Sequence, residues 1–404
     1  MSTSTCKPRI GLALAGGGPL GAFYEIGALC ALEDSIEGLD LTQCNSFIGV
    51  SAGAVLAANI ANDMSSRQLC AAFVQNSAEP PDSLDSKMLL RPAWDEYRLR
   101  LSKLPGLLLQ AGRQTLVLRR PWIRSLHALG RVIPSGFFSG DAVAARLHDV
   151  FSAPGRTDDF RKLKGRLVVV ATDLDTGEAI PFGMPGWDLS PISRAVQASG
   201  ALPGLYPPVQ LEGRYFADGA LKRTMHASVL LEEGLDLLLC LNPMVPFVSA
   251  HARGMGKVPA DKVAGSYVHR LVDGGLLWVL SQSVRAMIHS RMQLGFKAYA
   301  RSYPETDILL FEPEPNDAEV FFSNTLGYSR RRHIAEHAYQ ATRKQLRQRT
   351  STLQRQLQKH GLRLRSERLQ DTERYLLEVQ TQGRLARSMS LLDRSLRQLE
   401  AQAL

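Results

Sequence analysis

One serine of this chain stands between two glycines, at the point where an apolar segment gives way to small residues. Residues 47–54 read Phe-Ile-Gly-Val-Ser-Ala-Gly-Ala, so Ser51 lies between Gly49 and Gly53. A serine on a sharp turn from a strand to a helix exposes its hydroxyl, and flanking glycines remove Cβ atoms that would collide there. This spacing is typical of a nucleophilic serine, although plain glycine-rich turns share it.

Two further segments could complete an acyl-transfer site around this serine. Residues 16–21 read Gly-Gly-Gly-Pro-Leu-Gly and can present backbone N–H groups, while Asp218 precedes Gly219 and Ala220. Acyl transfer needs a nucleophile, a proton acceptor and donors for the oxyanion, and the three segments supply one each. The candidate catalytic residues are Ser51 and Asp218. The candidate oxyanion hole is Gly16, Gly17 and Gly18, and the glycines expected to support the motifs are Gly21, Gly49, Gly53 and Gly219.

Nucleotide binding is a second interpretation of the glycine loop, because residues 16–21 also satisfy G-x-G-x-x-G. A dinucleotide-binding unit places an acidic residue at the end of its second strand to hold the ribose. Here the corresponding strand ends in Val50 and Ser51. A serine flanked by glycines suits nucleophilic attack better, so the sequence favours acyl transfer.

A Ser-Asp-His triad and a metal site are two further alternatives. In enzymes that carry this triad on an α/β-hydrolase fold, the turn with the serine follows several strands of the chain. Here Ser51 follows only the second expected strand. No histidine stands in a context that favours it as the base; those weighed are His226, His251, His269, His289, His333 and His337. The acidic turn at 172–177 resembles a calcium loop but lacks the later glutamate, so we expect neither metal nor cofactor.

The elements around Ser51 are expected to form one strand-helix-strand unit over residues 9–62. Strands are predicted at 10–15 and 46–50, with a helix at 22–32 between them. Strands joined by a crossover helix are parallel, and ligands of such sheets bind at the carboxyl ends of the strands. The glycine loop and Ser51 both follow a strand at that end.

The rest of the chain continues the α/β pattern and ends in helices. Further strands are predicted at 165–171, 208–211, 214–217, 235–241 and 307–311, and helices at 193–199 and 268–300. Residues 77–139 form a leucine-rich, basic stretch, which we interpret as a helical insertion that covers a site. Helices are expected after residue 316, with breaks at Gly361 and Gly383. Leucines spaced 7-4-7 suggest a helical hairpin or an oligomerisation surface: Leu346, Leu353, Leu357 and Leu364.

Composition is that of an ordinary folded enzyme, with 404 residues, 45% of them hydrophobic and 22% charged. The net charge of +9 belongs to the C-terminal part, where residues 329–404 carry 17 Lys/Arg against 7 Asp/Glu. Such helices suit anionic lipid or nucleic acid, and equally a solvated face. Five scattered cysteines favour a reducing compartment. No apolar run reaches the ~18 residues that span a bilayer, so we expect a cytoplasmic protein, soluble or bound peripherally to a membrane.

The ordered glycine loop, G-x-S-x-G and Asp-Gly-Ala segments resemble the patatin-like phospholipase family. The similarity covers residues 9–240 and includes residues 198–208, Ala-Ser-Gly-Ala-Leu-Pro-Gly-Leu-Tyr-Pro-Pro, before the aspartate. It implies a three-layer α/β/α fold and hydrolysis of lipid acyl esters by a Ser51–Asp218 dyad, without metal or cofactor. One departure is Leu20, since family members usually carry Arg or Lys there; its effect on phosphate selectivity is open.

The resemblance also implies how the chain is divided and what it acts on. We expect a catalytic domain at 9–240 containing the insertion at 77–139, completion of the α/β core at 241–316, and a basic helical C-terminal extension at 317–404. The expected activity is of phospholipase A or lysophospholipase type. The alternatives are a non-catalytic lipid-binding or regulatory protein, or an esterase, thioesterase or polyester depolymerase. Expected partners are a lipid or membrane surface, contacted peripherally by the C-terminal helices, and a second copy of the chain, but no nucleic acid.

Overall fold

A mainly parallel sheet runs through the computed structural model, which describes residues 7–79, 82, 91–112, 134–222, 225–248, 271–322 and 330–377. The strands follow the order β6-β7-β4-β3-β1-β8-β9, and β5 pairs with β4 off this path. The parallel strands are β1 (Ile10–Leu14), β3 (Ser46–Val50), β4 (Arg166–Asp173), β8 (Leu237–Leu241) and β9 (Asp307–Phe311). The antiparallel strands are β5 (Ala179–Phe182) and β7 (Arg214–Asp218), which pair with β4, and β6 (Val209–Leu211), which pairs with β7.

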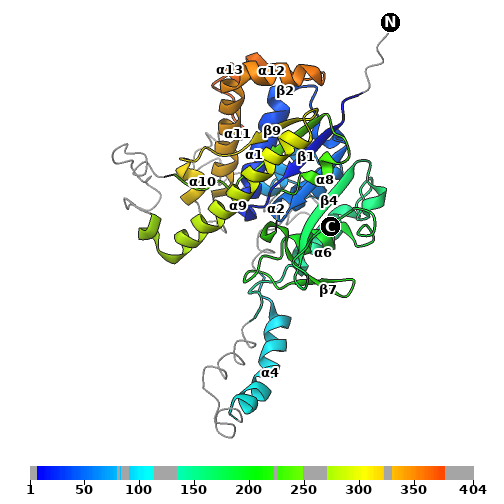
Figure 1. Cartoon of the computed structure of the whole chain (residues 1–404), viewed down its shortest axis with the longest axis vertical. Coiled ribbons are helices and arrows are strands. Elements are labelled where there is room, and N and C mark those ends of the chain that lie inside the picture. The colour runs from blue at the N-terminus through cyan, green and yellow to red at the C-terminus, as the bar shows by residue number, and fades with distance from the viewer. Residues whose placement is uncertain are drawn as a thin grey trace, which may run out of the picture.

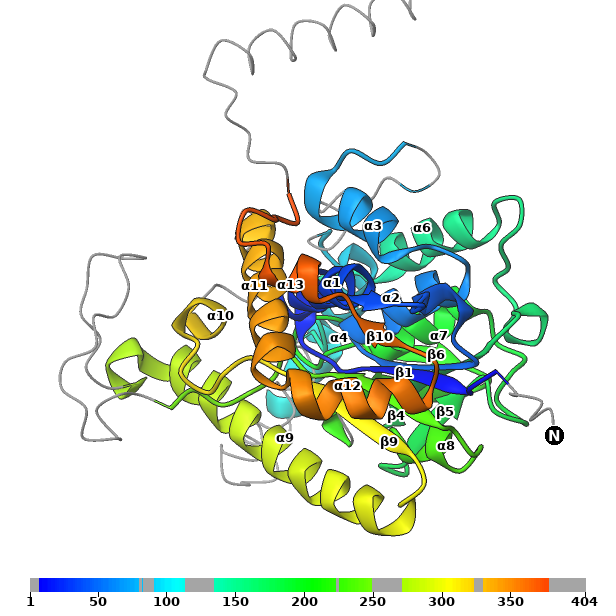
Figure 2. The same ribbon diagram turned by 90° about the horizontal axis from the view of Figure 1, so that it is seen from above.

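Helices cover both faces of this sheet, because successive side chains of each strand point to opposite sides. On β1, Leu12 and Leu14 belong to one buried cluster and Ala13 to another. The first cluster includes side chains of α1 (Gly18–Ser35), α2 (Ala52–Ala61), α6 (Asp141–Phe151), α7 (Ile192–Ser199) and α11 (Arg331–Gln348). The second includes α8 (Ser228–Leu231) and α9 (Gly275–Ser302). Figure 2 shows these two layers on either side of the strands, which confirms the expected three-layer α/β/α fold.

The smaller elements connect or flank these layers. The short helix α3 (Ser66–Leu69) follows α2, and the short helix α10 (Ala318–Phe322) follows β9. The strands β2 (Ile36–Glu37) and β10 (Arg363–Leu364) form a separate two-stranded sheet. Within the expected insertion, α4 (Trp94–Gly112) extends away from the body (Figure 1). Residues 83–90 and 113–133 of that insertion lie outside the described residues. No helix in the described part of the chain combines the length and apolar character needed to cross a bilayer.

Two helices start at other residues than expected. The first helix begins at Gly18 instead of residue 22, because Pro19 is well suited to a first helical turn, where no N–H is needed. The long helix α9 begins at Gly275 and follows a 3₁₀ turn at Leu271–Gly274, whereas helix was expected from residue 268. Residues 268–270 lie outside the described residues.

The C-terminal helices are packed into the same core as the sheet. After α11 come α12 (Thr350–Lys359) and α13 (Ser366–Gln370). α11 contacts α1 so closely that a Cβ added to Gly27 would lie 2.1 Å from the carbonyl oxygen of Ala335. Leu346, Leu353 and Leu357 are each 0% exposed. The oligomerisation interpretation of the leucine spacing is therefore wrong, because these side chains are buried within one chain.

The helical-hairpin interpretation of the same leucines is also wrong. α11 and α12 meet at Arg349, and in Figure 2 α12 turns aside from the end of α11 instead of running back along it. The expected break at Gly383 and residues 378–404 lie outside the described residues. The boundaries proposed between the catalytic domain, the core completion and the C-terminal extension stay predictions.

Several arginines of the basic C-terminal segment are used inside the fold. Arg343 is 1% exposed, and its guanidinium donates to the backbone carbonyls of Arg368, Asp371 and Arg374. Arg349 donates to the carbonyl of Leu310 at 3.2 Å. Part of the positive charge in this segment therefore holds helices together and does not face outward.

Candidate active site

The register of β4 with its two neighbours brings the serine and the aspartate together. β3 lies parallel to β4 with Val50 opposite Val170, so Ser51, the next residue, stands level with Ala171. On the other side, β7 lies antiparallel to β4 with Asp218 opposite Ala171. The carboxyl end of β3 and the end of β7 are thus set at the same height on the two sides of one strand.

The backbone at Ser51 forms a strained turn. Its φ is 53° and its ψ is −122°, and only a few non-glycine residues adopt positive φ. A Cβ at Gly49 would lie 2.4 Å from the Cα of Ala54, and one at Gly53 would lie 2.5 Å from the carbonyl oxygen of Leu14. Strand and helix fold back too closely here for any side chain, so the turn holds the half-buried Ser51 hydroxyl at its apex.

The Ser51 hydroxyl donates a hydrogen bond to Asp218. The distance from Ser51 Oγ to Asp218 Oδ2 is 2.6 Å. The other carboxylate oxygen of Asp218 accepts the N–H of Ala220 at 2.8 Å. This geometry is short for an O–H···O bond and puts a proton acceptor directly on the nucleophile.

Burial changes the acidity of this aspartate. Asp218 is 2% exposed, and loss of water around its carboxylate raises the pKa to about 6, although the bonds from Ser51 and Ala220 act in the opposite direction. A carboxylate with such a pKa is ionised at neutral pH and is a stronger base than an exposed aspartate. Its position and basicity are both those of a general base.

The glycine loop lies next to Ser51 at the start of α1. A Cβ on Gly16 would come within 3.1 Å of the Ser51 Cβ, and Gly17 is the residue that precedes the helix. Gly18 has φ +61° and opens α1. N–H groups at the start of a helix have no partner within it, and the helix dipole is positive there. The loop therefore offers donors to an anion beside the serine, although Pro19 has no N–H to give.

The remaining motif glycines allow close packing around these segments. Gly21 donates its N–H to the carbonyl of Gly17 at 3.1 Å and packs on Pro243. A Cβ on Gly219 would lie 2.2 Å from the carbonyl oxygen of Val170. All the residues that the sequence proposed for the site thus lie at one edge of the sheet.

Leu20, the departure from the family pattern, points into the core. Its side chain is 3% exposed and belongs to the same buried cluster as α2 and α11. The leucine therefore contributes packing at this position and puts no positive charge beside the glycine loop.

Two residues with a role at this site were missed at the sequence level. Ser199, at the end of α7, accepts the backbone N–H of Ser51 at 2.8 Å and donates to the carbonyl of Val170 at 2.6 Å. Thr172 donates to the carbonyl of Asp218 at 3.0 Å. Ser199 had been noted only as part of the family-like segment at 198–208, and nothing in its spacing shows which backbone group its hydroxyl meets.

The alternative residues have other partners. His333 and His337, on α11, pair with Glu319 and Asp317, and His251 and His269 lie outside the described residues. In the acidic turn, Asp173 accepts the backbone N–H of Asp175 and pairs with the guanidinium of Arg214.

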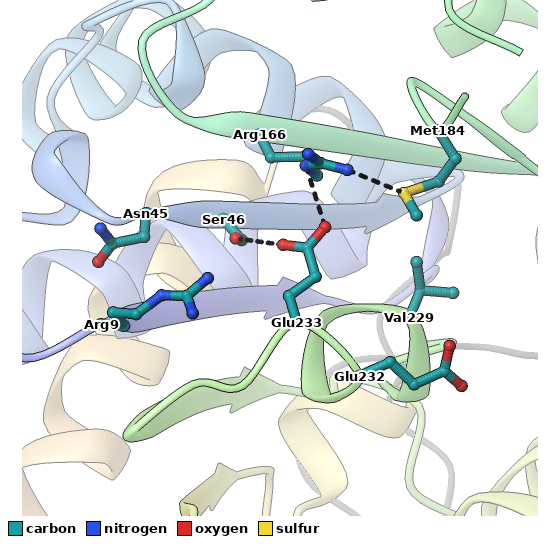
Figure 3. A pocket seen from close by; sticks show the side chains of 8 residues that line it. All are labelled: Arg9, Asn45, Ser46, Arg166, Met184, Val229, Glu232 and Glu233. Carbon is teal, nitrogen blue, oxygen red and sulfur yellow. Dashed lines mark hydrogen bonds and ion pairs between the residues drawn. The ribbon is translucent and has the colours of Figure 1, made fainter. Parts of the chain in front are cut away.

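A pocket of about 550 Å³ lies at the opposite edge of the sheet. Figure 3 shows that Arg9, Ser46 and Arg166, at the amino ends of β1, β3 and β4, line it together with Glu233. Arg166 pairs with Glu233 at 3.0 Å, and Ser46 donates to the same carboxylate. Charged side chains that line this pocket are thus paired with one another. The pocket lies away from the carboxyl ends of the parallel strands, where Ser51 is found.

The chain is similar to several known proteins. Among solved structures, the chain is similar to VipD from Legionella pneumophila, with 16% identity, 84% of this chain and 70% of VipD covered, and a TM-score of 0.34. It is also similar to the type III effector protein ExoU, with 19% identity, 85% and 53% covered, and a TM-score of 0.33. The chain thus spans about half the length of ExoU. A sequence model described as patatin-like phospholipase matches residues 12–231, more than half of the chain. The chain therefore belongs to the patatin-like phospholipase family, a family of lipid hydrolases.

Proposed function

We propose that this protein hydrolyses acyl esters of lipids, with the specificity of a phospholipase A or lysophospholipase, and that Ser51 and Asp218 form its catalytic dyad. The observation that carries the proposal is the 2.6 Å bond from the Ser51 hydroxyl to a buried carboxylate. Membership of the family supports the lipid substrate.

The first half of the reaction forms an acyl-enzyme. Ser51 Oγ attacks the ester carbonyl carbon while its proton passes to Asp218 Oδ2. Negative charge then develops on the carbonyl oxygen, where N–H groups of Gly16, Gly17 and Gly18 and the positive end of α1 stabilise it. Collapse of the intermediate breaks the ester C–O bond, and the leaving alcohol takes the proton from Asp218.

The second half regenerates the enzyme with the same groups. Asp218 accepts a proton from water, which attacks the acyl carbon, and Ser51 recovers its proton as the fatty acid leaves. No histidine is required, because one carboxylate serves as the base in both halves and as the acid that returns the proton.

The dyad is tested with Ser51→Ala and Asp218→Asn. Each should lower kcat/KM for a short-chain p-nitrophenyl ester by about 10⁴-fold or more, since the two groups act as one unit. Circular dichroism should show an unchanged fold. Full activity in both variants would overturn the dyad.

A fluorophosphonate probe separates catalysis from the non-catalytic alternative. The probe should label Ser51 in the wild type and not in Ser51→Ala. A lipid-binding protein without catalysis would remain unlabelled under conditions that label a known serine esterase.

The substrate class is tested separately, because the buried Leu20 supplies no cation for a headgroup phosphate. Lipid extracts incubated with the wild type should lose phospholipid or lysophospholipid and gain free fatty acid, relative to extracts incubated with Ser51→Ala. Release of acid from neutral esters, thioesters or polyesters alone would favour the esterase alternative.

A further inference from the structure

Helix α9 presents two different faces. On one side, Arg285, Ile288 and Met292 are buried against the body of the protein. On the other, exposed apolar side chains recur at helical spacing; we call them the apolar face of α9, and they are Leu276 (71% exposed), Leu280 (50%), Met287 (50%) and Leu294 (65%). Val279 and Val284 flank them and are also exposed. At about 100° per residue, this row lies on the opposite side of the helix from Arg285.

Such a face is unusual on a surface helix. Helices at a protein surface carry polar residues on the side turned to water, and contiguous exposed apolar patches mark binding surfaces. The buried side of α9 already supplies the contacts that fix it to the sheet. The apolar face of α9 is thus not explained by the packing of the fold.

The helix is attached to the segment after Asp218 and, through Pro243, to the glycine loop. The buried guanidinium of Arg285 donates to the carbonyls of Pro243 and Val245, at 3.4 and 3.3 Å. Pro243 packs on the glycine loop, since a Cβ on Gly17 would lie 2.6 Å from its ring. Farther along the helix, Arg291 donates to the carbonyl of Leu221, three residues past Asp218.

Further apolar side chains continue this surface around the site. Leu221 is 45% exposed and Leu202 is 40% exposed. Leu202 follows Ala201, whose carbonyl accepts the backbone N–H of Asp218. Phe137, 54% exposed, donates its N–H to Gly204 on the same loop. Exposed apolar groups therefore border the segment around Asp218, and one of them, Leu221, lies where α9 is attached.

The charge of α9 points to the kind of partner. Residues 275–302 contain four cationic residues and no aspartate or glutamate. Three of the cations, Arg291, Lys297 and Arg301, are exposed. Figures 1 and 2 show that the amino-terminal part of this helix extends beyond the α/β body. A helix with an apolar face and basic charge is suited to lie in the interface of an anionic bilayer.

We propose that the apolar face of α9 docks on an anionic lipid surface and thereby holds the mouth of the Ser51 site against its substrate. The inference rests on the proposed lipid hydrolase function. It assigns membrane contact to the helix beside the site, whereas the sequence had assigned it to the basic C-terminal helices. Through Arg285 and Arg291, a docked α9 would hold the glycine loop and the Asp218 loop at a fixed height above the lipid.

The experiment compares a double charge substitution with a single control substitution, both in the full chain. Leu276→Glu with Leu280→Glu alters the docking face. Leu189→Glu is the matched control, because Leu189 is an equally exposed leucine (69%) in the loop that follows β5, away from the site. Binding to vesicles of phosphatidylcholine and phosphatidylserine is measured by sedimentation, and hydrolysis is measured on the same vesicles and on a soluble short-chain ester.

The docking variant should bind the vesicles at least about tenfold more weakly than the wild type, and its ratio of vesicle hydrolysis to soluble-ester hydrolysis should fall similarly. Leu189→Glu should match the wild type in both. Unchanged vesicle binding of the docking variant would overturn the proposal. If Arg355→Glu, on α12, also lost vesicle binding while the docking variant kept it, membrane contact would belong to the C-terminal helices instead.

Three further outcomes distinguish a lipid from a second copy of the chain as the occupant, and separate the two proposals from each other. A wild-type dimer in light scattering that the docking variant dissociates, with vesicle binding unchanged, would assign the face to a second copy of the chain and overturn lipid docking. If the docking variant loses vesicle binding while the wild type hydrolyses no ester, the surface stands and the proposed hydrolase function fails. If the wild type hydrolyses the ester while the docking variant binds normally, only the surface fails.

Discussion

At the scale of single residues, the site depends on a carboxylate that is kept basic by burial. Asp218 has little contact with water, and one hydroxyl and one backbone N–H are its described partners. An exposed aspartate with its ordinary pKa near 4 would be a weak base toward an alcohol. Raising the pKa to about 6 makes the carboxylate more basic and still leaves it ionised at pH 7.

Hydrolysis should therefore depend on pH through this one group. Because the base must be ionised, kcat/KM for a soluble ester should fall about tenfold per pH unit below pH 6 and level off above it. The profile is measured between pH 4.5 and 8, with circular dichroism as a control for folding at each pH. A rate that stays constant between pH 5 and 7 would contradict the assignment of Asp218 as the base.

The same burial should reduce the stability of the folded protein. The pKa of Asp218 is higher in the folded state than its usual value of 3.8, so stability falls as the pH rises from about 4 to about 6. Asp218→Asn removes this effect and should raise the free energy of unfolding at pH 7 by on the order of 3 kcal/mol. At pH 4 the wild type is protonated, and the difference should largely vanish. Urea unfolding of both proteins at the two pH values measures it; a difference independent of pH would contradict it.

At the scale of elements, β4 and α7 determine where the serine turn lies. β4 sets the height of Ser51 and Asp218 by its register with β3 and β7. Ser199 then links the backbone of Ser51 to the carbonyl of Val170 on β4. The strained turn is held by this hydroxyl in addition to its two glycines, so Ser199 is a positioning residue.

Ser199→Ala should lower kcat by about 10- to 100-fold with a smaller change in KM, because the serine turn loses its fixed position. Stability should also fall, by about 1–3 kcal/mol, since a buried donor and a buried acceptor lose their partner. Ser193→Ala is the matched control: Ser193 lies on the same helix, is 2% exposed and donates to Asp158 at 2.7 Å. It should lose stability without loss of kcat. Equal losses of kcat in both variants would mean that Ser199 acts only on stability.

The sequence predicted the elements that follow from local patterns. The strand that ends at Val50 and the hairpin of β6 and β7 are short apolar runs with turns, and they lie within a residue or two of the expected bounds. The three-layer fold followed from the resemblance. Contacts between distant segments could not be read in this way: the partner of the Ser199 hydroxyl depends on the register of three strands. The buried position of Leu346 and Arg343 depends on α11 packing against α1, which no spacing within α11 determines.

At the scale of the whole molecule, the C-terminal helices complete the core that the N-terminal helices begin. Gly27 of α1 meets Ala335 of α11, and Arg343 caps the carbonyls of the segment that follows α12. Arg343 also lies over the ring of Tyr339, at 5.5 Å. The part of the basic segment described here is thus a support for α1, whose first turn borders the serine.

Arg343→Met should lower the free energy of unfolding by about 2–4 kcal/mol, because the substitution keeps the volume but leaves the carbonyls of Arg368 and Asp371 without this donor. Arg355→Met, at an exposed position on α12, should change it by less than about 0.5 kcal/mol. Both are measured by urea unfolding. Equal effects would mean that Arg343 contributes only its general charge.

The path of the chain through β3, β4 and β7 has a consequence for newly made protein. Ser51 and Asp218 are 167 residues apart, and they meet only when β4 has paired with both β3 and β7. During synthesis the serine emerges well before its base, as an ordinary alcohol with no proton acceptor. A chain in which β7 has not yet paired with β4 therefore carries Ser51 without the carboxylate proposed to activate it.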